Sequence, residues 1–152
     1  MPYRVIEHIP GRLLYYIIWD ELRAEDMVES NKEVHSYMDV QSTKVNIISN
    51  FLHMTSYSRD IAKLSSTFTL FKHDNHGWTV PISNDAVFKF VANLTVEMIK
   101  RASNSEGGLR AVNTEQAAIE KMESLVPDIA PIPALPDLAT MKAARPLSEM
   151  VG

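Results

Sequence analysis

Short runs of β-branched and aromatic residues alternate with stretches of helical periodicity, and this alternation limits the chain to a small set of folds. The strand-like runs span residues 3–9, 12–19, 43–49, 78–83 and 109–112. The helix-like stretches span residues 24–39, 57–71, 86–102 and 114–126, and Asn113 or Thr114 is expected to cap the last of them. Strands that alternate with helices favour a largely parallel sheet. Because Pro10-Gly11 makes a tight turn between the first two runs, we predict an α/β fold with a mixed five-stranded sheet and about four helices.

Composition places the chain among ordinary globular domains. Of its 152 residues, 45% are hydrophobic and 22% are charged, which suffices for one buried core. The net charge of -4 argues against a nucleic-acid partner, and the absence of cysteine excludes disulfides and thiol catalysis. The longest apolar run, residues 13–19, is far shorter than the roughly 20 residues of a membrane span. We expect a cytoplasmic protein with no secretory leader, membrane span or cofactor.

Residues 86–102 carry two apolar stripes, whereas one stripe suffices to pack a helix onto its own core. The first stripe contains Val87, Phe90, Val91, Leu94 and Met98. The second contains Phe88, Ala92, Val96 and Ile99. We expect the first stripe to pack inward and the second to face solvent as the interface of a homodimer. The alternatives for the apolar excess are a well-filled core and a cavity for a lipid-like molecule.

The last segment, residues 127–152, differs in composition from the preceding residues 1–126. It contains five of the eight prolines, which favour extended geometry, together with several large apolar residues. We treat it as a proline-rich apolar tail that follows the domain. Ile132, Leu135 and Leu138 are its candidate contact residues. The surface beneath them would be the chain's own domain, a second copy or another protein.

Several features together resemble a known family. They are the opening hairpin, the acidic start of the helix 24–39, the Gly77-Trp78 entry to the fourth strand, the helix 86–102, and the helix start at Asn113-Thr114-Glu115. In this order they resemble the SpoIIAA-like branch of the STAS superfamily, the group related to anti-sigma factor antagonists. The resemblance implies a small mixed sheet with amphipathic helices that binds proteins or ligands without catalysis. It also implies a lipid-binding cavity as an alternative, because related sequences are grouped with lipid-transfer folds.

Anti-sigma antagonists of the wider family carry an Asp-Ser-Ser-Gly-Leu-type motif where the helix after the third strand begins, and one serine there is phosphorylated. The matching residues 54–60 include Ser56 and Ser58 but lack the Asp-Ser-Ser-Gly order. A helix start would stabilise a phosphate on either serine, and helix capping accounts for the same residues. Asn50, His53 and Arg59 complete this candidate ligand or phosphorylation loop, at the strand ends where α/β folds bind ligands.

Metal binding and catalysis find little support in the sequence. His73 and His76 would bind zinc only with a third ligand such as His53 or Asp74, and a polar turn accounts for the same residues. The sequence has no Gly-x-Ser-x-Gly elbow, phosphate loop or dinucleotide fingerprint. We therefore expect no metal site, no catalytic residues and no enzymatic activity.

Three functions follow from these observations. The first is a non-enzymatic regulatory interaction module that self-associates through the helix 86–102 and the tail. The second is a carrier or sensor of a small apolar ligand, lined by the aromatic residues Tyr15, Tyr16 and Trp19 and by the helix around Phe68. The third is a phosphorylation-regulated antagonist that acts on a kinase-like partner.

Overall fold

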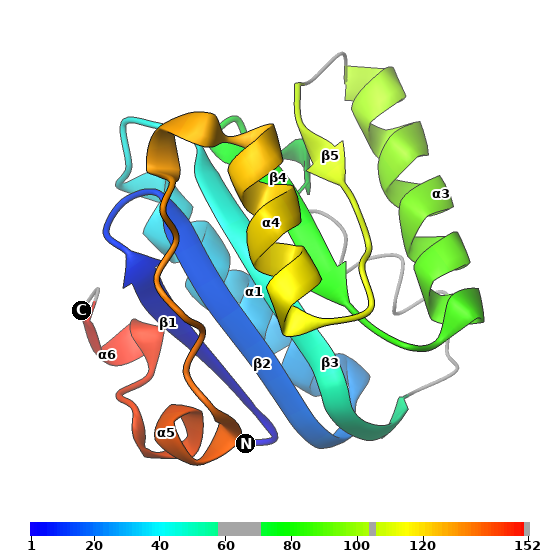
Figure 1. The fold of residues 1–152 in the computed structure, drawn as a ribbon, viewed down its shortest axis with the longest axis vertical. Helices are drawn as coiled ribbons and strands as arrows, with labels where there is room; N and C mark the ends of the chain where they lie inside the picture. Colours follow the sequence, from blue (N-terminus) through cyan, green and yellow to red (C-terminus); the bar gives the residue numbers. More distant parts are fainter. Residues whose placement is uncertain (58–70, 104–105, 151–152) are drawn as a thin grey trace.

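The computed structural model describes residues 1–57, 71–103 and 106–150. Five strands form one sheet in the order β1-β2-β3-β4-β5 (Figure 1). The elements along the chain are β1 (Tyr3–Ile9), β2 (Leu13–Leu22), α1 (Ala24–Asp39), β3 (Val45–Tyr57), β4 (His76–Ile82), α3 (Ala86–Ser103), β5 (Gly108–Leu109), α4 (Glu115–Leu125), η2 (Pro127–Ile129), α5 (Leu138–Ala143) and α6 (Leu147–Met150). Most of the predicted helix 57–71 lies outside the described residues.

The sheet is mixed, as predicted. β1 and β2 form an antiparallel hairpin in which Tyr3 lies opposite Ile18. Its turn contains Gly11 at φ 72°, a conformation that glycine adopts without steric cost. The pairs β2–β3, β3–β4 and β4–β5 are all parallel.

β3 is longer than the sequence predicts. Its apolar run ends near Ser49, but the strand continues to Tyr57. Over this extension it pairs with β2, with His53 opposite Trp19 and Tyr57 opposite Leu22. Backbone hydrogen bonds to β2 hold the extension in the sheet, so its polar side chains do not end the strand.

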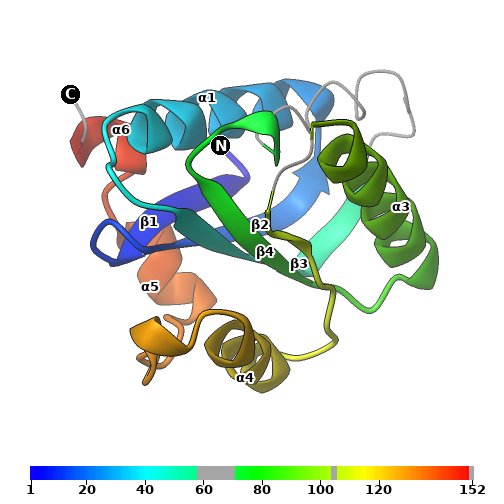
Figure 2. The same ribbon diagram turned by 90° about the horizontal axis from the view of Figure 1, so that it is seen from above.

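One face of the sheet is covered by α1 and α6 (Figure 2). α1 spans the predicted residues 24–39 and buries Val34, Tyr37 and Met38 against the sheet. The hydroxyl of Tyr16, on β2, lies 3.0 Å from the Ser30 Oγ atom on α1. Hydrogen bonding thus satisfies a polar group inside this first apolar core.

The opposite face is covered by α4, η2 and α5 (Figure 2). α4 is capped by Thr114, whose side-chain oxygen accepts a hydrogen bond from the Ala117 backbone N–H at 3.0 Å. Of the two capping residues that the sequence suggests, Asn113 and Thr114, the structure selects Thr114. Ala118 and Met122 on α4 are fully buried in this second core.

The tail passes from one face of the sheet to the other across β1 (Figures 1 and 2). Met141 of α5 is buried in the second core, and Leu147 of α6 is buried in the first. Between the two helices, the Arg4 guanidinium donates a hydrogen bond to the Ala144 carbonyl. Earlier in the tail, the His8 ring lies 2.8 Å from the Pro133 carbonyl oxygen. The tail therefore completes both cores and covers an edge strand.

α3 lies at the β4 and β5 side of the sheet (Figure 2). A third apolar cluster beneath it contains Phe71, Ala92, Val96 and Leu109. None of the described helices is long and apolar enough to cross a membrane.

Candidate functional site

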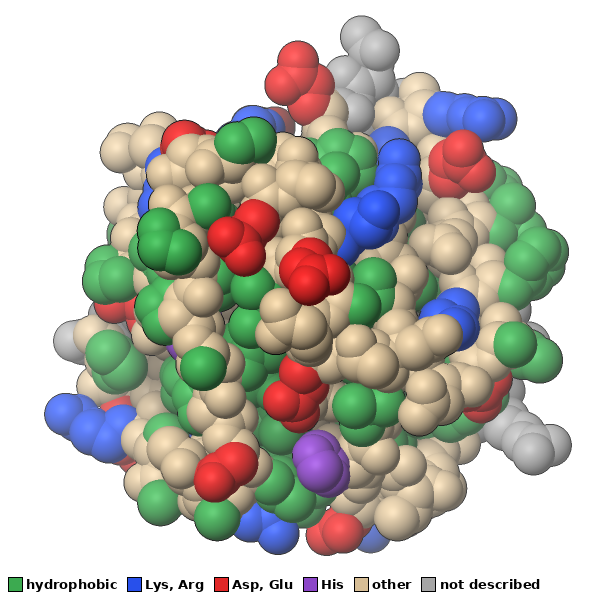
Figure 3. All heavy atoms as spheres, in the orientation of Figure 1, with side chains coloured by type: hydrophobic (Ala, Val, Ile, Leu, Met, Phe, Trp, Pro, Cys, Tyr) green, Lys and Arg blue, Asp and Glu red, His purple; other side chains and the backbone are tan. Residues whose placement is uncertain are grey.

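Among the described side chains of α3, four large apolar ones lie on its solvent-facing side. Val87, Phe90, Leu94 and Met98 are 67%, 68%, 49% and 64% exposed. Their spacing places them along one side of the helix, which we call the outer stripe. Hydrophobic side chains gather over α3 in the space-filling view (Figure 3). Scattered apolar residues are common on surfaces, but a row of four on one helix is typical of a binding surface.

The opposite side of α3 faces the protein interior. Ala92 and Val96 are buried in the third cluster, Ile99 packs against it, and Phe88 packs against the first core. These are the residues that the sequence placed at a dimer interface, and that assignment is wrong. The small side chains of Ala92 and Val96 let α3 lie close to Leu109 and Phe71, so the bulkier stripe is the one left in solvent.

Aromatic contacts fix the amino-terminal half of α3. The Phe88 ring lies 4.8 Å from the Phe51 ring, centroid to centroid, and 6.0 Å from the Tyr57 ring. Both partners belong to β3. The extension of β3 thus packs against α3 and fixes its position.

A buried polar pair fixes the carboxyl-terminal half of α3. The Lys100 Nζ atom lies 3.2 Å from the His76 Nδ1 atom and donates a hydrogen bond to the Glu106 carbonyl at 3.1 Å. The other ring nitrogen of His76 lies 2.7 Å from the Thr79 hydroxyl. Burial, followed by the charge of Lys100, holds the pKa of His76 well below its usual value of 6.5. His76 is therefore neutral and accepts a hydrogen bond from Lys100 through Nδ1.

The tail residues proposed for contacts pack on their own domain. Ile132 is buried in the second core, and Leu135 and Leu138 pack against it. Of the three surfaces that the sequence left open, the structure selects the chain's own sheet. The prediction that these residues form an interface between chains is therefore wrong, because they already pack in or against the second core.

The described part of the candidate ligand or phosphorylation loop is a strand. His53 and Ser56 are exposed on β3, and Asn50 is buried in the same strand. Ser56 therefore does not lie at a helix start, where backbone N–H groups would stabilise a phosphate or a serine would act as a cap. Ser58 and Arg59 lie outside the described residues.

Asn50 holds a polar cluster near the carboxyl end of the apolar part of β3. Its amide nitrogen donates to the Tyr15 hydroxyl at 2.9 Å and to Glu115 Oε1 at 3.1 Å. Its oxygen accepts a hydrogen bond from the Leu52 N–H at 2.9 Å. Burial raises the pKa of Tyr15 to about 12, so the phenol stays protonated at neutral pH. These bonds tie β2 and β3 to the start of α4.

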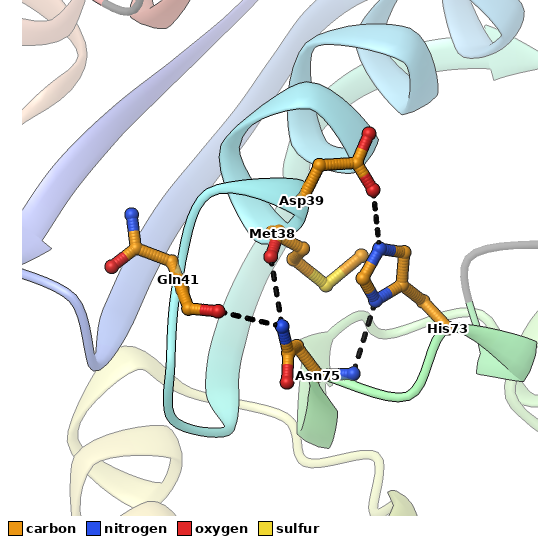
Figure 4. A network of polar contacts seen from close by, with 5 residues as sticks. All are labelled: Met38, Asp39, Gln41, His73 and Asn75. Carbon is orange, nitrogen blue, oxygen red and sulfur yellow. Dashed lines mark hydrogen bonds and ion pairs between the residues drawn. The ribbon is translucent and has the colours of Figure 1, made fainter.

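His73 and His76 do not converge on a metal site. The Nε2 atom of His73 lies 2.7 Å from Asp39 Oδ1, and its Nδ1 atom accepts the Asn75 backbone N–H at 3.0 Å (Figure 4). The Asn75 amide donates to the Met38 and Gln41 carbonyls. This network joins the segment before β4 to the end of α1. Within residues 1–57, 71–103 and 106–150, no three metal-ligating side chains gather.

A cleft of about 240 Å³ opens at the amino ends of β3 and β4. Its lining includes the charged side chains of Arg12, Lys44 and Glu106, together with Trp78. The aromatic residues expected to line an apolar cavity, Tyr15, Tyr16 and Trp19, are instead buried in the two cores. None of these three aromatic residues lines the cleft, and its charged lining does not fit a lipid-like ligand.

Both stripes of α3 could be recognised in the sequence, but their predicted directions are reversed in the structure, and the pairing of Lys100 with His76 was not predicted. The signal that separates the stripes is side-chain size, since Ala92 is small enough for close helix packing. The His76–Lys100 contact could not be predicted from the sequence, because 24 positions separate the two residues.

No family model matches the sequence, and no curated protein matches it. Solved structures match its fold. An uncharacterized DUF3478-family protein from Shewanella loihica PV-4, with a SpoIIAA-like fold, matches with a TM-score of 0.52 at 11% identity. That match covers 78% of this chain and 92% of that chain. The unphosphorylated anti-sigma factor antagonist SpoIIAA matches with a TM-score of 0.51 at 10% identity, over 80% of this chain and 97% of that chain. The predicted SpoIIAA-like fold is confirmed.

Proposed function

We propose that this SpoIIAA-like chain is a non-enzymatic regulatory module of the cytoplasm that binds protein through the outer stripe of α3. The observation that carries the proposal is the exposure of Val87, Phe90, Leu94 and Met98 along one side of a single helix. Each side chain loses unfavourable contact with water when a partner covers it. One of the proteins with a similar fold is the anti-sigma factor antagonist SpoIIAA, which is consistent with a regulatory role.

The contacts that hold α3 against the domain support a binding role for its outer stripe. Phe88 and Val96 anchor the helix on the inner side, and Lys100 fixes its far end to His76. A surface whose helix is already held in place loses little conformational entropy when it binds. The outer stripe is therefore prepared for a partner with an apolar groove or helix.

The polar clusters of the structure support a binding role more than a catalytic one. Asn50 and Tyr15 bond to each other, and His73 is bonded to Asp39 and to the backbone of Asn75. Groups that satisfy one another in this way stabilise a fold. The alternatives, an apolar-ligand carrier and a phosphorylation-regulated antagonist, have less support, because the aromatics of β2 fill the cores and Ser56 lies in a strand.

Photo-crosslinking in the native host tests this proposal. A benzophenone amino acid replaces Phe90 in the full chain. The matched control carries it at Val40, which is 70% exposed at the end of α1, away from α3 (Figure 2). We expect protein adducts at position 90 that are several-fold more abundant than those at position 40. Equal yields at the two positions would show that the outer stripe is not a binding surface.

A further inference from the structure

We infer that the outer stripe of α3 binds the outer stripe of a second copy, with the two helices antiparallel. This inference rests on the proposed function and names its partner. A homodimer with two-fold symmetry uses one surface twice, so that surface must be complementary to itself. The outer stripe meets this requirement in both its shape and its charge.

The apolar side chains of the outer stripe are arranged symmetrically about its centre. In an antiparallel pair, Val87 of one copy lies beside Met98 of the other, and Phe90 lies beside Leu94. The midpoint of the first pair lies between residues 92 and 93 and that of the second at residue 92, so the two agree to within one residue. All four side chains are then covered at once, because each large residue faces another large residue across the axis.

The charges at the two ends of α3 specify the same direction. Asp85 precedes the helix at its positive end, and Arg101 lies in its last turn. Their midpoint is residue 93, so antiparallel pairing brings Arg101 of each copy close to Asp85 of the other. Parallel pairing would place like charges and like ends of the helix dipoles together. Arg101 forms an ion pair with Glu97 of its own helix at 3.2 Å, and both side chains are exposed, so Arg101 can exchange this partner for Asp85 of a second copy.

The size of the outer stripe indicates weak association. Four side chains with their polar neighbours bury less than about 1,200 Å² in total, which is the range of transient interfaces. The dimer is therefore concentration-dependent, as suits a regulatory module. Other proteins with a matching apolar surface would compete with the second copy for the same stripe.

Disulfide trapping tests the antiparallel arrangement, and the chain contains no cysteine that would interfere. We expect an oxidised equimolar mixture of tagged Val87→Cys and untagged Met98→Cys to give mixed dimers several-fold above either homodimer. Paired helices lie about 8–10 Å apart, so facing residues reach disulfide distance. Two copies of residue 87 would instead be separated by roughly 16 Å along the axis, which no disulfide spans.

The control mixture pairs Val40→Cys with Met98→Cys, since Val40 is similarly exposed but lies at the end of α1, away from α3 (Figure 2). Circular dichroism checks that each variant is folded. Dominant Val87→Cys homodimers would establish parallel pairing and overturn the inference, as would mixed dimers no more abundant than in the control. If that happens while photo-adducts at position 90 contain a different protein, self-pairing fails and the proposed function stands. If adducts are also absent, both fail.

Discussion

Phe90 and Val96 lie on opposite sides of α3, and their surroundings differ completely. The Phe90 side chain is 68% exposed, whereas Val96 is 1% exposed against the third apolar cluster. One apolar residue therefore contributes to folding, and the other remains free to contribute to binding. This separation of roles within one helix leads to the first prediction.

Truncation of the two residues should separate stability from association. Val96→Ala leaves a cavity in the third cluster and should lower the free energy of unfolding by about 2 kcal/mol. Phe90→Ala removes an exposed side chain and should change it by less than about 0.5 kcal/mol. Urea unfolding of the two variants measures the difference. A loss of equal size for Phe90→Ala would contradict the assignment of the outer stripe to solvent.

Substitutions in the tail test whether it is part of the folded core. Met141 is fully buried on one face of the sheet, whereas Met150 is 53% exposed. We expect Met141→Ala to cost about 2–5 kcal/mol and Met150→Ala less than about 0.5 kcal/mol, both measured by urea unfolding. Similar small effects would mean that the tail leaves the domain in solution. Removal of residues 127–152 should expose both cores and cause aggregation.

Stability should fall in mild acid because of His76. Its pKa is held well below 6.5 in the folded chain, so near that pH the unfolded chain binds a proton that the folded chain does not. The contribution of His76 is fully present above pH 6.5 and is lost as the pH falls below that value. The slope from this group is at most about 1.4 kcal/mol per pH unit. Urea unfolding between about pH 8 and about pH 5 measures it.

The matched control for this pH dependence is His76→Gln, which keeps a hydrogen-bonding side chain but does not titrate. The variant should be less stable near neutral pH and should show a shallower decline with acid. Burial also lowers the pKa of His35, so part of the decline remains in the variant. Identical slopes for the two proteins would exclude His76 as a source of acid sensitivity.

The cap of α4 provides a prediction that separates two adjacent residues. Thr114→Ala removes the acceptor for the Ala117 N–H and should cost about 1 kcal/mol. Asn113, the other residue that the sequence suggests, contacts Lys89 on the surface, and Asn113→Ala should cost less than about 0.5 kcal/mol. Thermal or urea unfolding of both variants decides the question. A larger loss for Asn113→Ala would reverse the cap assignment.

Much of the fold could be predicted because local signals agree with the tertiary structure. The helix 24–39 has the predicted bounds, and its acidic first turn and apolar stripe point to the same limits. The hairpin at Gly11 follows from turn chemistry. The end of β3 could not be predicted, since pairing with β2 holds polar residues such as Ser56 in the strand.

The candidate site was harder to predict because helical periodicity does not indicate direction. Both stripes of α3 repeat with the same spacing, and only the position of the helix against Leu109 and Phe71 decides which is buried. Lys100 lies on the buried side, where a sequence argument would not place a lysine, because His76 and the Glu106 carbonyl receive its hydrogen bonds. Contacts between distant positions determine such details.

Pairing through the outer stripe is tested most directly by the molar mass of the full chain, measured by light scattering from micromolar to millimolar concentration. We predict that the wild-type mass rises above 17.1 kDa toward twice that value as concentration increases. The double variant Phe90→Ser, Met98→Ser should remain at 17.1 kDa, whereas the control Val40→Ser should behave as the wild type. Association of the double variant equal to that of the wild type would contradict the role of the outer stripe. A wild-type chain that stays monomeric throughout would contradict its self-pairing.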